Sequence, residues 1–293
     1  MAFETKGEVS WEVPQGYYEH IAESDPNSLI HLTGRMLVAP VAIALFGRPE
    51  IVTSPGFDIA RKDFNKGNIF ITSTHRTDWE TVIQPATFER VGLHEARPIA
   101  KLDPLFQYSI LRGAMHGLGA FAIDKRKGKT DLEGILLAQL GILRRGGIIT
   151  GYVEGTRITK NPLEVADIQM GAIMAAIINN SLIVPTAFAG LSKEKTGEGD
   201  KRRTIARDKP SNFGRKIKLV AAFEDPFRLE QPNFDIDMLG ANPRTLSKEQ
   251  RATKNEYLRD GAIQVKGSMQ KALNAAYKKR GNGLEEVFEQ IEA

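Results

Sequence analysis

Short apolar segments of the sequence alternate with longer amphipathic ones, and this alternation constrains the fold more than any other feature. The clearest apolar segment, 68–74 (NIFITST), is short, rich in β-branched residues and preceded by Lys66 and Gly67, which is typical of a buried strand. A short extended piece is predicted at 98–100, and further strands at 120–123, 148–153, 182–188 and 217–223. Helices are predicted at 79–91, 104–115, 130–145, 168–178 and 258–276. This order predicts an α/β fold with a mixed, largely parallel sheet flanked by helices.

The N-terminal part of the sequence contains its longest apolar run. Residues 36–46 lie between two arginines and are interrupted by Pro40, so the run is far shorter than the roughly 20 apolar residues that a bilayer span needs. A helix lying in the membrane interface is predicted, with a buried core helix as the alternative. The chain is accordingly divided into a helical membrane-docking segment, 1–50, and a catalytic domain, 51–293.

Positive charge is concentrated in one segment of the chain. The formal net charge is +4, and residues 192–216 carry nine Lys or Arg against four Asp or Glu. This basic loop, polar and longer than most connections, is consistent with an anionic partner and equally with a solvated surface loop. It contains one aromatic residue, Phe213, and therefore offers little base stacking, so no nucleic-acid partner is expected.

The residue types present restrict the chemistry available. The sequence has no cysteine, which excludes disulfides, thiolate metal sites and cysteine nucleophiles within it. Its five histidines lie far apart and in no spacing typical of zinc ligands. We therefore expect neither a metal site nor a bound cofactor.

A histidine follows the first predicted strand, and an acid follows the histidine by five positions. In open α/β sheets the loops after the strands line the active crevice, where His75 can take a proton from a hydroxyl. Five residues of helix turn about 500°, so His75 can pair with Glu80 only from a loop preceding the helix. The alternative from spacing alone is a loop histidine beside an acidic helical turn.

Two further strand ends carry groups suited to a phosphate. After the strand at 148–153, Gly155 allows close backbone approach, Thr156 offers a hydroxyl, and Arg157 offers a bidentate fork that Glu154 can orient. Segment 119–126 (GAFAIDKR) likewise delivers Arg126 to a strand end. The first segment alone is equally consistent with a strand-end turn bearing a surface ion pair, and the second alone is a weak signal. Together, a base and a phosphate clamp without a cysteine nucleophile indicate direct attack by a hydroxyl.

In this order, the segments resemble the lysophospholipid acyltransferase family, which includes 1-acylglycerol-3-phosphate and glycerol-3-phosphate acyltransferases. The family's first motif is a histidine, four further residues and then an aspartate. It resembles 75–80, where Glu80 replaces the aspartate. The other resembling segments are 100–106, the second motif at 119–126, Glu-Gly-Thr-Arg at 154–157 and the Val-Pro strand at 182–185. The resemblance covers about residues 29 to 280.

The resemblance implies a reaction and a set of site residues. His75, oriented by Glu80 or alternatively by Asp78, would deprotonate a lysophospholipid hydroxyl, most directly that of 1-acylglycerol-3-phosphate. The hydroxyl would attack the thioester of acyl-CoA or acyl carrier protein, which serves as co-substrate. The implied substrate-binding residues are Arg76, Lys101, Arg126, Glu154, Gly155, Thr156 and Arg157.

The implied location is the cytoplasmic face of a membrane, with the protein peripheral or monotopic and the membrane surface as a partner. Glycerol-3-phosphate or a glycolipid is the alternative acceptor within the same family. Because Glu80 departs from the family pattern, a non-catalytic lipid-binding protein on the same fold is the alternative from another class.

Overall fold

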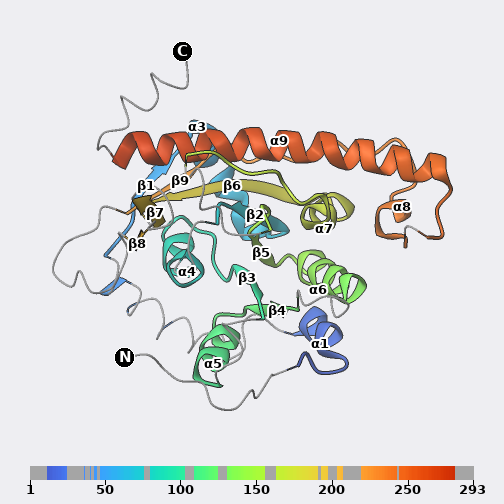
Figure 1. Cartoon of the computed structure of the whole chain (residues 1–293), viewed down its shortest axis with the longest axis horizontal. Coiled ribbons are helices and arrows are strands. Elements are labelled where there is room, and N and C mark those ends of the chain that lie inside the picture. The colour runs from blue at the N-terminus through green and yellow to red at the C-terminus, as the bar shows by residue number, and fades with distance from the viewer. Residues whose placement is uncertain are drawn as a thin grey trace.

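The largest element of the fold is a mixed β-sheet. A computed structural model describes residues 12–24, 36, 40, 43–44, 47–75, 80–102, 109–124, 131–155, 163–190, 193–196, 203–206, 219–242 and 244–280. Within these residues, seven strands form one sheet in the order β1-β9-β6-β2-β5-β3-β4 (Figure 1). In chain order they are β1 Glu50–Thr53, β2 Ile69–Ser73, β3 Arg97–Lys101, β4 Phe121–Ile123, β5 Ile148–Gly151, β6 Leu182–Ala189 and β9 Val220–Phe223. Only β6 and β9 pair antiparallel in this sheet, which confirms the predicted mixed, largely parallel arrangement.

Helices cover both faces of the sheet. They are α1 Tyr17–Glu23, α3 Pro55–Ala60, η1 Arg61–Lys66, α4 Glu80–Arg90, α5 Ser109–Gly117, α6 Leu132–Arg144, η2 Met170–Ala172, α7 Met174–Ile178, α8 Asp237–Gly240 and α9 Lys248–Arg280. The alternation of side chains along β2 divides the core into two clusters. Phe70 packs in the cluster that includes α1, α6, α7 and α9, whereas Ile69 and Ile71 pack in the cluster with α3, η1 and α4. Burial on both faces explains why Ile69, Phe70 and Ile71 follow one another in β2 with no polar residue between them.

Helix α9 confirms the predicted amphipathic helix and extends it. The residues that define its predicted apolar stripe are all buried: Leu258, Ala262, Val265, Met269, Ala272 and Ala276. The helix has 33 residues, and at 1.5 Å per residue its length is about 50 Å. It packs against β6 and β9 and runs along most of the long axis of the molecule (Figure 1). The stripe therefore closes one face of the sheet.

Helix α1 protects the edge of the sheet, a role that the sequence did not predict. Strand β4 is the edge strand, and its central residue Ala122 would otherwise expose unpaired backbone groups. The N–H of Ala122 donates to the hydroxyl of Tyr17 over 3.0 Å, and the hydroxyl of Tyr18 donates to its carbonyl over 3.2 Å. Burial raises the pKa of Tyr17 to about 12, so its hydroxyl stays neutral at physiological pH. Two adjacent tyrosines thus continue the hydrogen bonding of the sheet.

Replacing Tyr17 with phenylalanine is expected to destabilise the fold by about 1–3 kcal/mol, because the N–H of Ala122 would be left buried without an acceptor. Denaturant unfolding followed by circular dichroism measures this change. Tyr257→Phe is the matched control, since the hydroxyl of Tyr257 bonds the Glu230 carbonyl at an exposed position where water can replace it. Equal stabilities of Tyr17→Phe and the wild type would contradict this role of α1.

Several predicted elements differ in detail from the observed ones. The helix predicted at 168–178 is interrupted, because Gln169 has an extended conformation before η2 and α7 begins only at Met174. Leu132, an apolar residue of the helix predicted at 130–145, is 73% exposed. It is the first residue of α6, and helical side chains lean toward the N-terminus, so its side chain extends past the end of the helix. Strand β1 was not predicted; it is short and only half-buried.

Two segments of functional interest lie largely outside the described residues. Of 29–47, the structure describes only five positions, among which Met36 is helical and 67% exposed. Within the basic loop, β7 Lys193–Thr196 and β8 Arg203–Ala206 form an antiparallel pair. The division of the chain at residue 50 remains a prediction. In the described part of the chain, no helix combines the length and the apolar character that crossing a bilayer requires.

Candidate active site

The structure places His75 just beyond the carboxyl end of a central strand. β2 is fully buried between β6 and β5, and Thr74 prolongs the contact with β6, where its N–H donates to the Thr186 carbonyl over 3.3 Å. His75 follows immediately, and its side chain is 16% exposed. The rigid strand therefore delivers an imidazole that remains accessible to a ligand, at the edge where parallel α/β sheets bind substrates.

Glu80 is the partner of this histidine. It is the first residue of α4, its side chain is fully buried, and its Oε2 lies 3.4 Å from the Nδ1 of His75. The geometry is that expected from the sequence, with the histidine before the helix and the acid in its first turn. This distance of 3.4 Å is longer than the 2.9–3.0 Å that is usual for an N–H···O hydrogen bond.

A second His–Glu pair, at the other end of α4, shows why spacing alone does not identify a site. Glu89 near the end of α4 and His94, again five residues apart, have their Oε2 and Nδ1 only 2.6 Å apart. Both side chains are well exposed, at 39% and 64%. This pair precedes β3 and hence lies toward the amino ends of the parallel strands. Burial of the acid and position at the carboxyl edge distinguish His75 and Glu80 from it.

Glu154 contacts the backbone of the histidine. Its carboxylate is 2% exposed; Oε2 accepts from the N–H of His75 over 2.8 Å, and Oε1 accepts from the N–H of Ala166 over 2.9 Å. Sequence reasoning assigned Glu154 to the substrate-binding residues and to orienting Arg157. The structure adds a bridge from the end of β5 to the base of the His75 loop.

Gly155 occupies a position that only glycine suits. Its φ is +72°, and a Cβ added there would lie 2.6 Å from Cγ of Gln169. The turn from Tyr152 to Gly155, closed by the N–H of Gly155 donating to the Tyr152 carbonyl, requires both the left-handed backbone and the missing side chain. The observed neighbour of Gly155 is the side chain of Gln169, and close approach of the Gly155 backbone to an anion stays a prediction.

Tyr152 and Thr81 were missed as site residues by sequence reasoning. The ring of Tyr152 stacks on the imidazole of His75, with ring centroids 4.0 Å apart and planes inclined by 20°. Its hydroxyl lies 2.8 Å from Oγ1 of Thr81, the residue that follows Glu80. The only available signal was a tyrosine directly after a strand that leads into the Glu154–Gly155 turn.

Gln84, a buried polar residue one turn beyond Glu80, holds α4 against the sheet by hydrogen bonds. Gln84 is 1% exposed; its Nε2 donates to Oγ of Ser73 over 2.8 Å, and its Oε1 accepts from Oγ1 of Thr150 over 3.4 Å. Ser73 is on β2 and Thr150 is on β5. The position of α4, and with it that of Glu80, is thereby tied to the two strands that carry the site.

The remaining predicted site residues lie mostly outside the described part of the chain. These are Arg76, Asp78, Arg126, Thr156 and Arg157. Lys101 is described as the last residue of β3, in register with Ile123 on β4. Strands β2, β5, β3 and β4 are parallel neighbours, so their carboxyl ends lie on the same side of the sheet. Among the described residues, no group of three or more Asp, Glu or His side chains is arranged to hold a metal ion.

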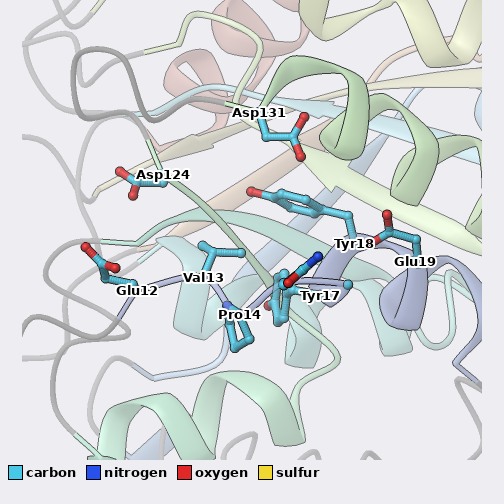
Figure 2. A pocket seen from close by; sticks show the side chains of 10 residues that line it. Glu12, Val13, Pro14, Tyr17, Tyr18, Glu19, Asp124 and Asp131 are labelled. Atoms are coloured by element: carbon cyan, nitrogen blue, oxygen red, sulfur yellow. The ribbon is translucent and has the colours of Figure 1, made fainter.

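A pocket of about 400 Å³ lies where residues 12–19 meet the end of β4 and the start of α6 (Figure 2). Its lining includes four acids: Glu12, Glu19, Asp124 and Asp131. None of the ten residues that line it, all of them described, is Lys or Arg. Such a lining disfavours a phosphate, and neither His75 nor Glu80 contributes to it. The pocket is therefore distinct from the candidate active site.

Comparisons with known proteins give a similarity of fold and no similarity of sequence family. No protein-family model and no curated protein sequence matches the chain. Among solved structures, the chain is similar to the 1-acyl-sn-glycerophosphate (LPA) acyltransferase PlsC from Thermotoga maritima. The two are 14% identical, with a TM-score of 0.43, over 80% of this chain and 79% of that chain. A similarity of this size carries no information about individual site residues, so the chemistry rests on the geometry above.

Proposed function

We propose that the protein is an O-acyltransferase that moves a fatty acyl group from a thioester to a lysophospholipid hydroxyl, with 1-acylglycerol-3-phosphate as the preferred acceptor. The observation that carries this proposal is the pairing of half-buried His75 with fully buried Glu80 at the carboxyl edge of the sheet. A histidine held by a buried carboxylate is suited to take a proton from a hydroxyl. Acyl transfer as the reaction is supported by the segments at 75–80, 119–126 and 154–157, which resemble the acyltransferase motifs and occur in the same order.

In the proposed step, Glu80 accepts a hydrogen bond from Nδ1–H, so that Nε2 is the basic nitrogen. Nε2 takes the acceptor's proton as the hydroxyl oxygen attacks the thioester carbonyl carbon. The tetrahedral intermediate collapses, the C–S bond breaks, and the thiolate receives the proton from the imidazolium. The products are an ester and a free thiol, and His75 returns to its neutral state. The donor is acyl-CoA or acyl carrier protein, and no metal or bound cofactor takes part.

The acceptor phosphate is assigned to cationic groups at neighbouring strand ends. Lys101 ends β3, and Arg126 and Arg157 follow β4 and β5 in the sequence. The parallel pairing of these strands supports a common location, because their carboxyl ends meet at one edge. Arg76, Gly155 and Thr156 complete the proposed phosphate site. Bidentate arginine contacts favour a phosphate over a neutral headgroup.

Membrane docking belongs to the same proposal. The acceptor and the product both partition into lipid, and the apolar run at 36–46 with its flanking arginines is suited to the membrane interface. The proposed location is the cytoplasmic face of a membrane, with the protein peripheral or monotopic. The exposed side chain of Met36, within this apolar run, is compatible with docking on a membrane surface.

A donor and acceptor panel tests the proposed function. Radiolabelled acyl-CoA and acyl carrier protein are each incubated with lysophosphatidate, glycerol-3-phosphate, a lysophospholipid without a terminal phosphate, and a glycolipid. The expected result is fastest transfer to lysophosphatidate, because the arginines bind its terminal phosphate. A preference for another acceptor would remove the substrate assignment. No transfer in any combination, with lipid binding retained, would indicate the non-catalytic alternative.

A further inference from the structure

Tyr152 contacts His75 and Thr81, the residue that follows Glu80, and neither contact is explained by the acyl-transfer chemistry alone. Its ring covers one face of the imidazole at a centroid distance of 4.0 Å. Rotation of the imidazole would break this stacking, so Tyr152, directly after the neighbouring strand β5, favours the observed plane of the His75 ring. The fixed plane matters because a rotated ring would no longer direct Nδ1 toward Glu80.

The hydroxyl of Tyr152 reaches the helix that carries the acid. It lies 2.8 Å from Oγ1 of Thr81, which is 1% exposed and is the next residue after Glu80. One side chain therefore bridges the end of β5 to the imidazole and to the first turn of α4. Gln84 bonds the same helix to the sheet one turn further on. The Thr81 contact is therefore closer to Glu80 along α4 than the Gln84 contacts are.

We propose that Tyr152 is a positioning residue that holds the imidazole plane of His75 and the first turn of α4 in register, so that Nδ1 faces Glu80 and Nε2 faces the acceptor hydroxyl. This inference rests on the proposed function, since it assigns Tyr152 to the same catalytic step. Tyr152 acts through His75 and not on the substrate. Its loss therefore lowers kcat while the KM for the acceptor changes little.

Four variants separate the ring from the hydroxyl. Tyr152→Phe keeps the ring, Thr81→Val removes the hydroxyl partner, the double variant removes both hydroxyls, and Tyr152→Leu removes the ring. We expect Tyr152→Phe and Thr81→Val each to lower kcat about fivefold, with no further loss in the double variant, because both delete the same hydrogen bond. Tyr152→Leu is expected to lower kcat about 30-fold or more, with KM within about twofold.

A spectroscopic measurement gives a second readout that needs no turnover. In protein labelled with ¹⁵N-histidine, the ring nitrogens of His75 report the tautomer, and the His75→Ala spectrum assigns them. We expect the wild type to hold the Nδ1–H tautomer, Tyr152→Phe to keep it, and Tyr152→Leu to show a mixture of tautomers. Matched controls are Tyr257→Phe and Thr253→Val on α9, which remove hydroxyls bonded to backbone carbonyls and should leave kcat and tautomer unchanged.

The outcomes distinguish this inference from the proposed function. If Tyr152→Leu keeps the wild-type tautomer and kcat, or if the hydroxyl losses add fully in the double variant, the positioning role is overturned. If the tautomer changes as expected but the wild type transfers no acyl group, the positioning stands and the proposed function falls. Should Tyr152→Leu fail to fold, Tyr152→Phe and Thr81→Val decide through kcat and their non-additivity.

Discussion

Replacing His75 with alanine is expected to lower kcat for acyl transfer by about 10³-fold, the largest effect of any single substitution in this chain. General-base catalysis typically contributes 10²- to 10⁴-fold, and His75 is the base proposed for deprotonating the acceptor hydroxyl. The KM for lysophosphatidate should stay within about twofold, because the phosphate is assigned to Lys101, Arg126 and Arg157. Initial rates with a labelled thioester donor, measured across acceptor concentrations, separate the two parameters.

His94→Ala is the matched control for this experiment. It removes the histidine of an equally spaced His–Glu pair that lies on the surface. Its kcat should equal that of the wild type, which shows that loss of a histidine by itself does not impair the enzyme. Comparable rates for His75→Ala and His94→Ala would exclude His75 as the base.

Replacing Glu80 with glutamine is expected to lower kcat by about 100-fold, near the lower end of the range for general-base catalysis. The substitution keeps size and burial but removes the charge that stabilises the imidazolium, and the amide no longer selects the Nδ1–H tautomer. The same labelled-donor assay measures kcat, and the ¹⁵N spectrum of His75 should show a mixture of tautomers. A residue with a purely structural role would leave that spectrum unchanged.

Two further variants make the Glu80 result specific. Glu80→Asp keeps the charge but shortens the side chain, and because the Nδ1–Oε2 distance is already 3.4 Å, its kcat should fall between those of the wild type and Glu80→Gln. Glu89→Gln, in the surface pair on the same helix, should have wild-type activity. If Glu80→Gln keeps wild-type kcat, Glu80 does not orient the base, and Asp78 becomes the candidate to test.

Elements that are buried continuously or along one stripe were predictable from the sequence. Strand β2 is apolar on both faces because the sheet is covered on both sides, and α9 shows its apolar stripe at three- and four-residue steps. Elements whose position depends on a distant partner were not predictable. α1 is short, and its tyrosines act on the backbone of Ala122, which is more than 100 positions away. Half-buried β1 has the same limitation, since it pairs with the distant strand β9, where Glu50 is in register with Val220.

The candidate site likewise contains contacts that the sequence predicts and contacts that it does not. The His75–Glu80 contact was predictable because both residues follow one strand and lie five positions apart. The contacts of Glu154 with the His75 backbone and of Tyr152 with Thr81 connect residues 79 and 71 positions apart. They depend on the register of β2 against β5, in which Thr72 pairs with Gly151. Local sequence patterns do not encode that register, so sequence reasoning assigned Glu154 only to substrate binding and overlooked Tyr152.

Release of free thiol coupled to ester formation tests the central proposal most directly. The purified protein is mixed with lysophosphatidate in vesicles and with acyl-CoA or acyl carrier protein as donor. Thiol release is measured by a colour reaction, and the lipid product is measured by mass spectrometry. We expect one acylated lipid per thiol released, dependent on the acceptor and lost in His75→Ala. Thiol release without a lipid product, or vesicle binding without any thiol release across the donors and acceptors, would contradict a lysophospholipid acyltransferase that uses His75 as its base.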